Sequence, residues 1–297
     1  MESIACNKRF GSMKPSASMA LTARARELQK TDPTIIGLAG GEPDFPTPDR
    51  ICMEAVRYLS QGYTHYCAVT GIPELRSRIQ KKLEDDNCIR CQADDILIMP
   101  GGKFAIYAAV NALLNEGEEV ILLNPAWVSY EPIILSAGAV PVNVPLDYRK
   151  NYEITLDALE AAATPRTKML IINYPNNPTG RVLSRREADA VEAFMLAHPE
   201  VLLLSDEIYE KLLYDGNENI SMASYESIRA RTYRKRLFQV CGYDRLAYCL
   251  YGRSKGVYRA DYKAVPAQHL LCQCIRSESR RGGAGMHTGN GRNVCDL

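Results

Sequence analysis

The chain of 297 residues has few of the features that direct a protein to a membrane or a secretory route. No apolar run approaches the roughly 20 residues that cross a bilayer. The first residues, MESIACNKRFGSMKPSAS, lack the apolar core of a secretory signal. A net charge of +1 gives no overall attraction to nucleic acid or to an acidic membrane. We therefore expect a cytoplasmic protein with neither a membrane nor a nucleic-acid partner.

Metal-binding patterns are scarce as well. The ten cysteines include one close pair, Cys88 and Cys91, but no second pair to complete a tetrahedral zinc site. The four histidines are scattered, and none belongs to an HExxH pattern. We expect no metal.

What the chain does contain is an alternation of short apolar runs and helical segments from residue 96 onward. Five runs have strand character, namely DILIMP, EEVILLN, AVPVNVP, KMLIIN and VLLLSDE. The segments between them, KFAIYAAVNALLNEG, SYEPIILSAG, TLDALEAAA and SRREADAVEAFMLAHP, have helical character. Strands separated by helices predict an α/β fold, a mostly parallel sheet with helices on both faces.

Residues 231–297 differ in composition from the rest. They hold 13 Lys and Arg against 4 Asp and Glu, a net charge of +9, whereas residues 1–230 carry −8. They also hold five of the ten cysteines and show no helix or strand period. A basic tail for an acidic partner is one interpretation. The other is that this segment was never selected as protein.

Two of the predicted strands end in segments with binding potential. Gly101, Gly102 and Lys103 lie between a strand and a helix, where backbone N–H groups can hold a phosphate. Trp127, the only tryptophan, follows the next strand and can stack on a planar ligand. Taken singly, the glycines are more often an ordinary turn, and the tryptophan is equally well a core residue.

Two later strand ends carry polar side chains. Asn177, in NYPNNPTG, offers an amide to a ligand oxygen, although such sequences are also ordinary turns. Asp206 ends an apolar strand, and a buried carboxylate needs a cation or donor unless it merely caps a helix. Tyr209 follows three residues later, near the same edge if a helix begins there. The carboxyl ends of parallel strands share one edge, so we expect a common site.

Together these segments resemble the cofactor contacts of the class I aminotransferases, which use pyridoxal 5'-phosphate. LAGGEPDFPTP (38–48) is similar to that family's N-terminal substrate segment, and GYTHYCAVTGIPELR (62–76) to its segment that reaches a neighbouring subunit. The likeness covers residues 14–232. It implies a fold type I large domain at 46–230, preceded by an arm and small-domain segment at 1–45, with the small C-terminal domain missing.

The resemblance also implies roles for the residues that contact the cofactor. Gly101, Gly102 and Lys103 would contact the phosphate, and Trp127 would stack on the pyridine ring. Asp206 would pair with the ring nitrogen and keep the ring cationic, which makes it an electron sink.

Further roles concern the phenolic oxygen, the substrate and the partner subunit. Asn177 and Tyr209 would bond the phenolic oxygen. Gly41, Trp127 and Asn177 would contact the substrate, with Gly41 beside its carboxylate. Tyr66 would reach the phosphate across a homodimer interface.

The family also requires a lysine about thirty residues beyond the aspartate, which attaches the cofactor and moves the proton. Gln239 and Val240 stand at the expected place, and neither can form a Schiff base. Lys255 follows Ser254, but it lies 49 positions beyond Asp206 and in a sequence unlike the family's. No catalytic residue is therefore assigned in this frame.

A change of reading frame near residue 232 would account for the loss. Read across the codon boundary, Gln239–Val240 permits lysine, and the preceding codons permit NGFS, so that the shifted frame allows NGFSK. HLLCQCIRSESRRG permits SSVNAFAAKAAV, again similar to the family. On this hypothesis residues 231–297 are an out-of-frame tail, which we expect to be disordered and which explains its own composition without a nucleic-acid partner.

The leading functional hypothesis is a transaminase that exchanges an amino group between an L-amino acid and a 2-oxo acid, with an aspartate or aromatic donor, impaired here by the missing lysine. A pyridoxal-phosphate-dependent carbon–sulfur lyase would have the same site. A non-catalytic binding protein with a basic tail is the alternative from a different class.

Overall fold

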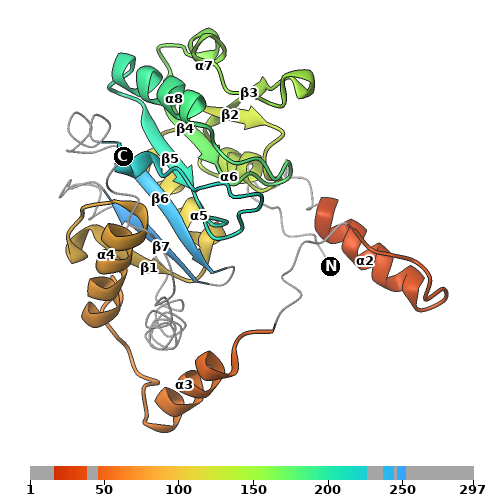
Figure 1. Ribbon diagram of the computed structural model, residues 1–297, viewed down its shortest axis with the longest axis vertical. Helices are drawn as coiled ribbons and strands as arrows, with labels where there is room; N and C mark the ends of the chain where they lie inside the picture. The colour runs from red at the N-terminus through yellow and green to blue at the C-terminus, as the bar shows by residue number, and fades with distance from the viewer. Residues whose placement is uncertain (1–16, 39–45, 226–236, 244–245, 252–297) are drawn as a thin grey trace, which may run out of the picture.

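The computed structural model describes residues 17–38, 46–225, 237–243 and 246–251 (Figure 1). The α-helices are α2 Ala17–Gln29, α3 Asp49–Ser60, α4 Pro73–Asn87, α5 Gly102–Leu113, α6 Tyr130–Ser136, α7 Leu156–Ala162 and α8 Arg185–Ala197. The strands are β1 Ile96–Met99, β2 Glu119–Asn124, β3 Val140–Pro145, β4 Thr167–Asn173, β5 Leu202–Asp206, β6 Leu237–Tyr243 and β7 Leu246–Tyr251. Short 3-10 helices are Ala93–Asp95, Tyr148–Lys150 and Met222–Ser224.

The strands form one sheet in the order β1-β7-β6-β5-β4-β2-β3. Strands β3, β2, β4, β5 and β6 are parallel neighbours, and β7 runs antiparallel to both β6 and β1. Strand β1 therefore points the same way as β6. The carboxyl ends of β1, β2, β4 and β5 consequently lie at one edge of the sheet, the edge at which ligands bind in open α/β folds.

The central strands are buried on both faces, as in parallel sheets that carry helices on each side. In β5, Leu202 and Leu204 pack in the cluster that includes α5 and α6, whereas Leu203 packs in the cluster that includes α7 and α8. In β1, Leu97 joins the first cluster and Ile98 packs against α4. Successive side chains of a strand point to opposite faces of the sheet, so the core is divided into one layer on each face.

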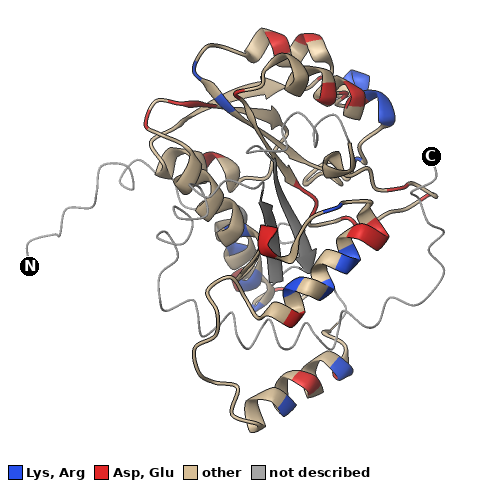
Figure 2. Ribbon diagram, turned by 90° about the vertical axis from the view of Figure 1, so that its left-hand side faces the viewer, with Lys and Arg blue, Asp and Glu red and all other residues tan. Residues whose placement is uncertain are grey.

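Charge follows this layering. Lys, Arg, Asp and Glu lie on the helices and loops, and the strands drawn in tan carry few of them (Figure 2). Helix α8 shows how the sequence sets a boundary, since Ser184 and Glu187 form a capping box at its N-terminus. No helix among the described residues combines the length and apolar character that crossing a membrane requires.

Helices α2 and α3 project away from the body formed by the sheet and its covering helices (Figure 1). Helix α3 has an apolar row that nothing in the described chain covers, with Met53 72 % exposed and Val56 63 % exposed. Ile36 and Leu38, in the segment between the two helices, are also exposed. The described part of the chain thus leaves these apolar side chains exposed.

The predicted α/β class and the order of its strands and helices between residues 95 and 199 are confirmed. The expectation of disorder throughout 231–297 is wrong for β6 and β7, which lie in that segment and belong to the sheet. The physical reason is that β5 would otherwise expose an unpaired edge, and backbone hydrogen bonds to β6 satisfy it. The sheet therefore continues beyond the boundary expected at residue 230.

Candidate active site

The phosphate-binding segment has the geometry expected at a helix N-terminus. Gly101 follows β1 with φ of 107°, a backbone conformation that favours glycine, and α5 begins at the next residue. The first N–H groups of a helix have no intrahelical acceptor and carry a partial positive charge. Gly101, Gly102 and Lys103 thus present backbone donors at the sheet edge that suit an anionic group.

Lys103 and Trp127 meet at this corner. The Nζ of Lys103 lies 5.2 Å from the centroid of the Trp127 ring, within the range of a cation–π contact. Trp127 is partly buried against the α5–α6 core cluster and meets the ring of Tyr130 edge-on, with centroids 5.3 Å apart. The structure therefore brings the residues predicted for the phosphate and the ring face into one place.

Asp206 is the buried acid of this edge, with only 4 % of its surface exposed. Its Oδ2 accepts a hydrogen bond of 2.6 Å from the Tyr130 hydroxyl, and its Oδ1 accepts one of 3.2 Å from the Ile208 N–H. Burial raises the pKa of Asp206 to about 6, and the bonds from Tyr130 and Ile208 oppose that rise. A buried carboxylate suits a cationic partner, because the partner's charge would replace the stabilisation by water that the carboxylate loses on burial.

Asn177 and Tyr209 are brought together as predicted. The amide Nδ2 of Asn177 donates to the Tyr209 hydroxyl over 3.1 Å. Asn173, the last residue of β4, joins their two loops, since its Nδ2 donates to the Asp206 carbonyl and its Oδ1 accepts from the Asn177 N–H, both over 2.9 Å. No helix begins at Tyr209, since residues 208–211 form turns. The bond to Asn177 positions the tyrosine without a helix.

A buried ion pair holds the loop after β4 against helix α8. Arg181 donates to both carboxylate oxygens of the fully buried Glu187, over 2.7 and 3.0 Å. Burial acts to raise the pKa of Glu187, but the bonds from Arg181 and Ser184 outweigh it and lower that pKa below its ordinary value. The Asn176 N–H also donates to the Arg181 carbonyl over 2.8 Å, which closes the loop.

A second pair of acids lies beneath this edge. Glu207 is buried and accepts bonds from the hydroxyls of Ser205 and Ser221. Burial, with a smaller contribution from the charge of Glu210, raises the pKa of Glu207 to about 7. Glu210 in turn accepts from the Lys82 amine. This cluster attaches α4 to the segment after β5 rather than facing the predicted ligand.

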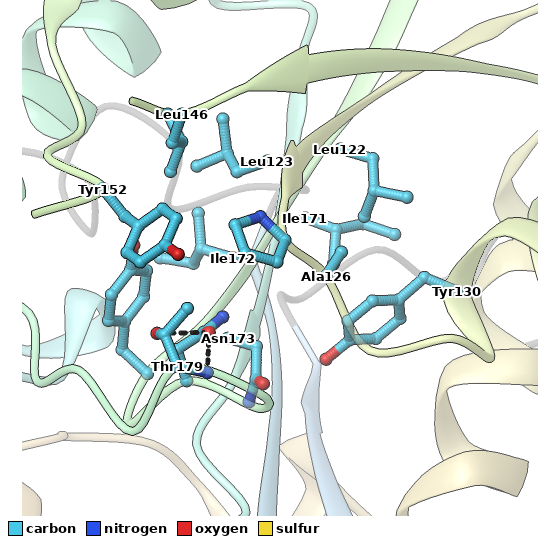
Figure 3. Close-up of a pocket in the computed structure, with 13 residues that line it drawn as sticks. Leu122, Leu123, Ala126, Tyr130, Leu146, Tyr152, Ile171, Ile172, Asn173 and Thr179 are labelled. Carbon is cyan, nitrogen blue, oxygen red and sulfur yellow. Dashed lines mark hydrogen bonds between the residues drawn. The ribbon is translucent and has the colours of Figure 1, made fainter. Parts of the chain in front are cut away.

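A small pocket adjoins the site at Tyr130 and Asn173. Tyr130, Asn173 and Thr179 line it together with apolar residues of β2 and β4 (Figure 3). Trp127, Asp206 and the residues predicted for the phosphate are not among its lining residues. It is therefore a neighbouring space between loops and not the surface on which the predicted contacts converge.

Of the predicted residues, Tyr66 is not brought to the others, and Gly41 lies outside the described residues. Tyr66 is 77 % exposed, as a residue that acts on a neighbouring subunit would be in an isolated chain, and its role stays a prediction. Ser254 and Lys255 also lie outside the described residues. Within the part of the chain that the structure describes, no group of His, Cys, Asp and Glu could hold a metal ion.

The place expected for the lysine can be located by strand register. Strand β6 pairs in parallel with β5, with Gln239 opposite Ser205 and Val240 opposite Asp206. The backbone at the expected lysine position thus lies directly beside the acid that ends β5. Neither residue is a lysine, and the place expected for one stays a prediction.

Comparison with known proteins decides the family. The profile of the family described as "Aminotransferase class I and II" matches residues 33–255, three quarters of the chain. The chain belongs to the class I and II aminotransferases. Class I aminotransferases use pyridoxal phosphate, and the anion-binding turn, aromatic face and buried acid described above fit its three parts. The match continues past residue 232 into the segment of altered composition.

Individual relatives carry related names. The chain is 40 % identical to an aspartate/prephenate aminotransferase of Cereibacter sphaeroides, over 90 % of this chain and 64 % of the relative. It is 41 % identical to an aspartate aminotransferase of Bacillus sp., over 75 % of this chain and 57 % of the relative. The chain thus spans less than two thirds of the length of these relatives.

Solved structures agree on the fold. An aspartate aminotransferase of Thermus thermophilus with maleate superposes with a TM-score of 0.81 at 31 % identity, covering 96 % of this chain and 76 % of that one. One from Rhizobium meliloti gives a TM-score of 0.85 at 28 % identity, covering 99 % and 72 %. The expected fold type I architecture is confirmed.

Sequence reasoning missed two residues of the site, Tyr130 and Asn173. Asn173 carried a usable signal, because it ends an apolar strand with a polar side chain, as Asp206 does. Tyr130 carried almost none, since only its place three residues after Trp127 pointed to the site.

Proposed function

We propose that the chain is the cofactor-binding part of a pyridoxal-phosphate-dependent transaminase that moves an amino group between an L-amino acid and a 2-oxo acid. The observation that supports this most is Asp206, a buried acid at the carboxyl end of β5 that is bonded to Tyr130, whose ring packs edge-on against Trp127. When bound, pyridoxal phosphate supplies an electron sink for a carbanion at the substrate α-carbon.

Each residue contributes a separate part of the binding. The N–H groups of Gly101 and Gly102, with the Lys103 amine, hold the phosphate. Trp127 covers one face of the ring and excludes water from it. Asp206 holds a proton on the ring nitrogen, because its buried charge is compensated only while that nitrogen is cationic.

The remaining contacts orient the ring. Asn177 and Tyr209 donate to the phenolic oxygen. The bonds of Asn173 to the Asp206 carbonyl and to the Asn177 N–H fix the positions of these donors relative to Asp206. Gly41 contacts the substrate carboxylate. The names of the relatives above favour an aspartate-type donor.

We also propose that the functional unit is a homodimer in which Tyr66 of one subunit reaches the phosphate of the other. The exposure of Tyr66 and of the apolar row on α3 supports this, since large exposed apolar patches mark interfaces. The cytoplasmic location and the absence of a nucleic-acid partner stay predictions of the sequence.

The chain as written lacks the lysine, so the test uses a gene whose frame is corrected near residue 232. The corrected protein is expected to bind pyridoxal phosphate and to change its absorbance when an L-amino acid is added, with a 2-oxo acid as product. Pyruvate and ammonia as products would instead indicate a carbon–sulfur lyase. The absence of any spectral change with the common amino acids would contradict the proposal.

A further inference from the structure

The hydroxyl of Tyr130 is the shortest side-chain contact of Asp206 and has no place in the contacts assigned so far. It is completely buried, and it donates to Oδ2 over 2.6 Å. A bond this short between a phenol and a carboxylate is charge-assisted. The bond is possible only while the phenol keeps its proton, and burial together with the charge of Asp206 raises the pKa of Tyr130 well above its ordinary value.

The position of Tyr130 is fixed by its surroundings. It opens α6, its ring packs edge-on against Trp127, and it belongs to the core cluster between α5 and the sheet. The same side chain therefore contacts both the residue proposed for the ring face and the acid proposed for the ring nitrogen. Movement of Tyr130 would disturb both contacts at once.

We propose that Tyr130 is a positioning residue that orients the Asp206 carboxylate and limits its basicity, so that the shared proton stays on the ring nitrogen of the cofactor. This inference rests on the proposed function. A carboxylate that accepts two donors, Tyr130 and the Ile208 N–H, competes less strongly for a proton than one that accepts a single donor. Loss of the phenol would let the proton move to Asp206 and weaken the electron sink.

Few groups of the described residues act on this pair. Tyr130 and the Ile208 N–H act on Asp206, and Tyr209 acts weakly on Tyr130. Glu207 is adjacent in sequence, but its oxygens accept bonds from Ser205 and Ser221. Removal of one hydroxyl should therefore change the Asp206 titration without rearranging other charges.

The first measurement compares the 297-residue chain with its Tyr130→Phe variant by carboxyl ¹³C NMR, with Asp206 assigned from Asp206→Asn. Loss of one hydrogen bond to a charged group corresponds to a rise of about one to two in the pKa of Asp206. Tyr174→Phe is the matched control, because Tyr174 is also buried but is influenced by Glu187 and Arg181. It should leave the Asp206 titration unchanged.

The second measurement adds pyridoxal 5'-phosphate labelled with ¹⁵N in the ring. The wild type should show the shift of a protonated ring nitrogen, and Tyr130→Phe should move it toward the unprotonated value. A chain with 3-fluorotyrosine at position 130, a stronger donor that preserves the fold, should change the Asp206 pKa in the opposite direction to Phe.

The results of these measurements distinguish a failure of the role proposed for Tyr130 from a failure of the proposed function. Equal Asp206 titrations and equal ring shifts in wild type and Tyr130→Phe, in chains that bind the cofactor, would overturn the inference alone. Binding by neither the 297-residue chains nor the frame-corrected protein would overturn the proposed function and the inference with it. Should Tyr130→Phe fail to fold, an unchanged titration in the fluorotyrosine chain would decide against the inference.

Discussion

The loops at the carboxyl edge of the sheet and the projecting segment around α3 differ in how far the chain completes them. At the sheet edge, Asn173 bonds to both neighbouring loops, and Arg181 and Glu187 satisfy each other in a buried pair. On α3, by contrast, Met53 and Val56 are mostly exposed. Within the described residues, the polar groups of the first region are satisfied, whereas the apolar side chains of the second are left exposed.

This difference separates two physical tasks. Binding a cofactor requires groups fixed before the ligand arrives, and buried hydrogen bonds supply that rigidity. Covering an apolar helix requires additional surface, and here it must come from a second copy or from protein that the described residues do not include. The difference also implies that damage to the two regions should have different consequences, stability in one case and association in the other.

The largest effect is expected from breaking the ion pair between Arg181, in the loop after β4, and Glu187 of α8. Arg181→Met leaves the fully buried charge of Glu187 without its partner, and loss of one member of a buried pair costs about 3–5 kcal/mol. Chemical denaturation should show this loss of unfolding free energy. Arg186→Met is the matched control, because Arg186 is 83 % exposed in its pair with Glu153 and should change stability by less than about 1 kcal/mol. Equal losses in both variants would contradict the assignment.

A second effect, nearly as large, concerns pH. The pKa of Glu207 is about 7 in the folded chain, above its ordinary 4.5, so the folded state keeps a proton that the unfolded state releases. Its contribution to stability is present at low pH and is lost as pH rises from 4.5 through 7, a fall of about 3 kcal/mol. Glu207→Gln should remove this part of the pH dependence and leave the smaller part due to Asp206.

The control for that comparison is Glu84→Gln, which removes an exposed carboxylate from α4. Denaturation at pH 5 and pH 8 should give the wild-type slope for Glu84→Gln and a flatter slope for Glu207→Gln. A slope that Glu207→Gln leaves unchanged would mean that this acid is not protonated on folding.

The smallest effect is expected on α3. Val56→Asp places a charge in the exposed apolar row and should weaken self-association of the frame-corrected protein by about tenfold or more, corresponding to about 1.4 kcal/mol. Sedimentation at several concentrations measures this, with Ala161→Asp as control, because Ala161 is exposed on another helix, α7. An unchanged dimer would show that another part of the protein covers this row.

The sequence predicts the sheet well because its strands are short apolar runs bounded by turn residues, as in VLLLSDE before Asp206. It predicts the convergence of Lys103, Trp127, Asn177 and Tyr209 because parallel strands end at one edge. It cannot predict that Tyr130 donates to Asp206, since that contact joins residues 76 positions apart through tertiary packing.

Strand β6 was missed for a different reason. Its segment has a basic, cysteine-rich composition, and composition was given more weight than the short apolar run before Tyr243. Pairing with β5 depends on backbone groups, which most sequences can supply. The strand register places Val240 opposite Asp206, and the place that the resemblance implies for the lysine stays a prediction.

The central claim is that Asp206 holds a protonated ring nitrogen, and one binding comparison tests it most directly. The chain should bind pyridoxal 5'-phosphate on the order of 100-fold more tightly than the analogue in which CH replaces the ring nitrogen, because only the former offers a cation to the buried acid. Asp206→Ala should abolish most of that preference. Equal affinity of the wild-type chain for the two compounds would contradict the account.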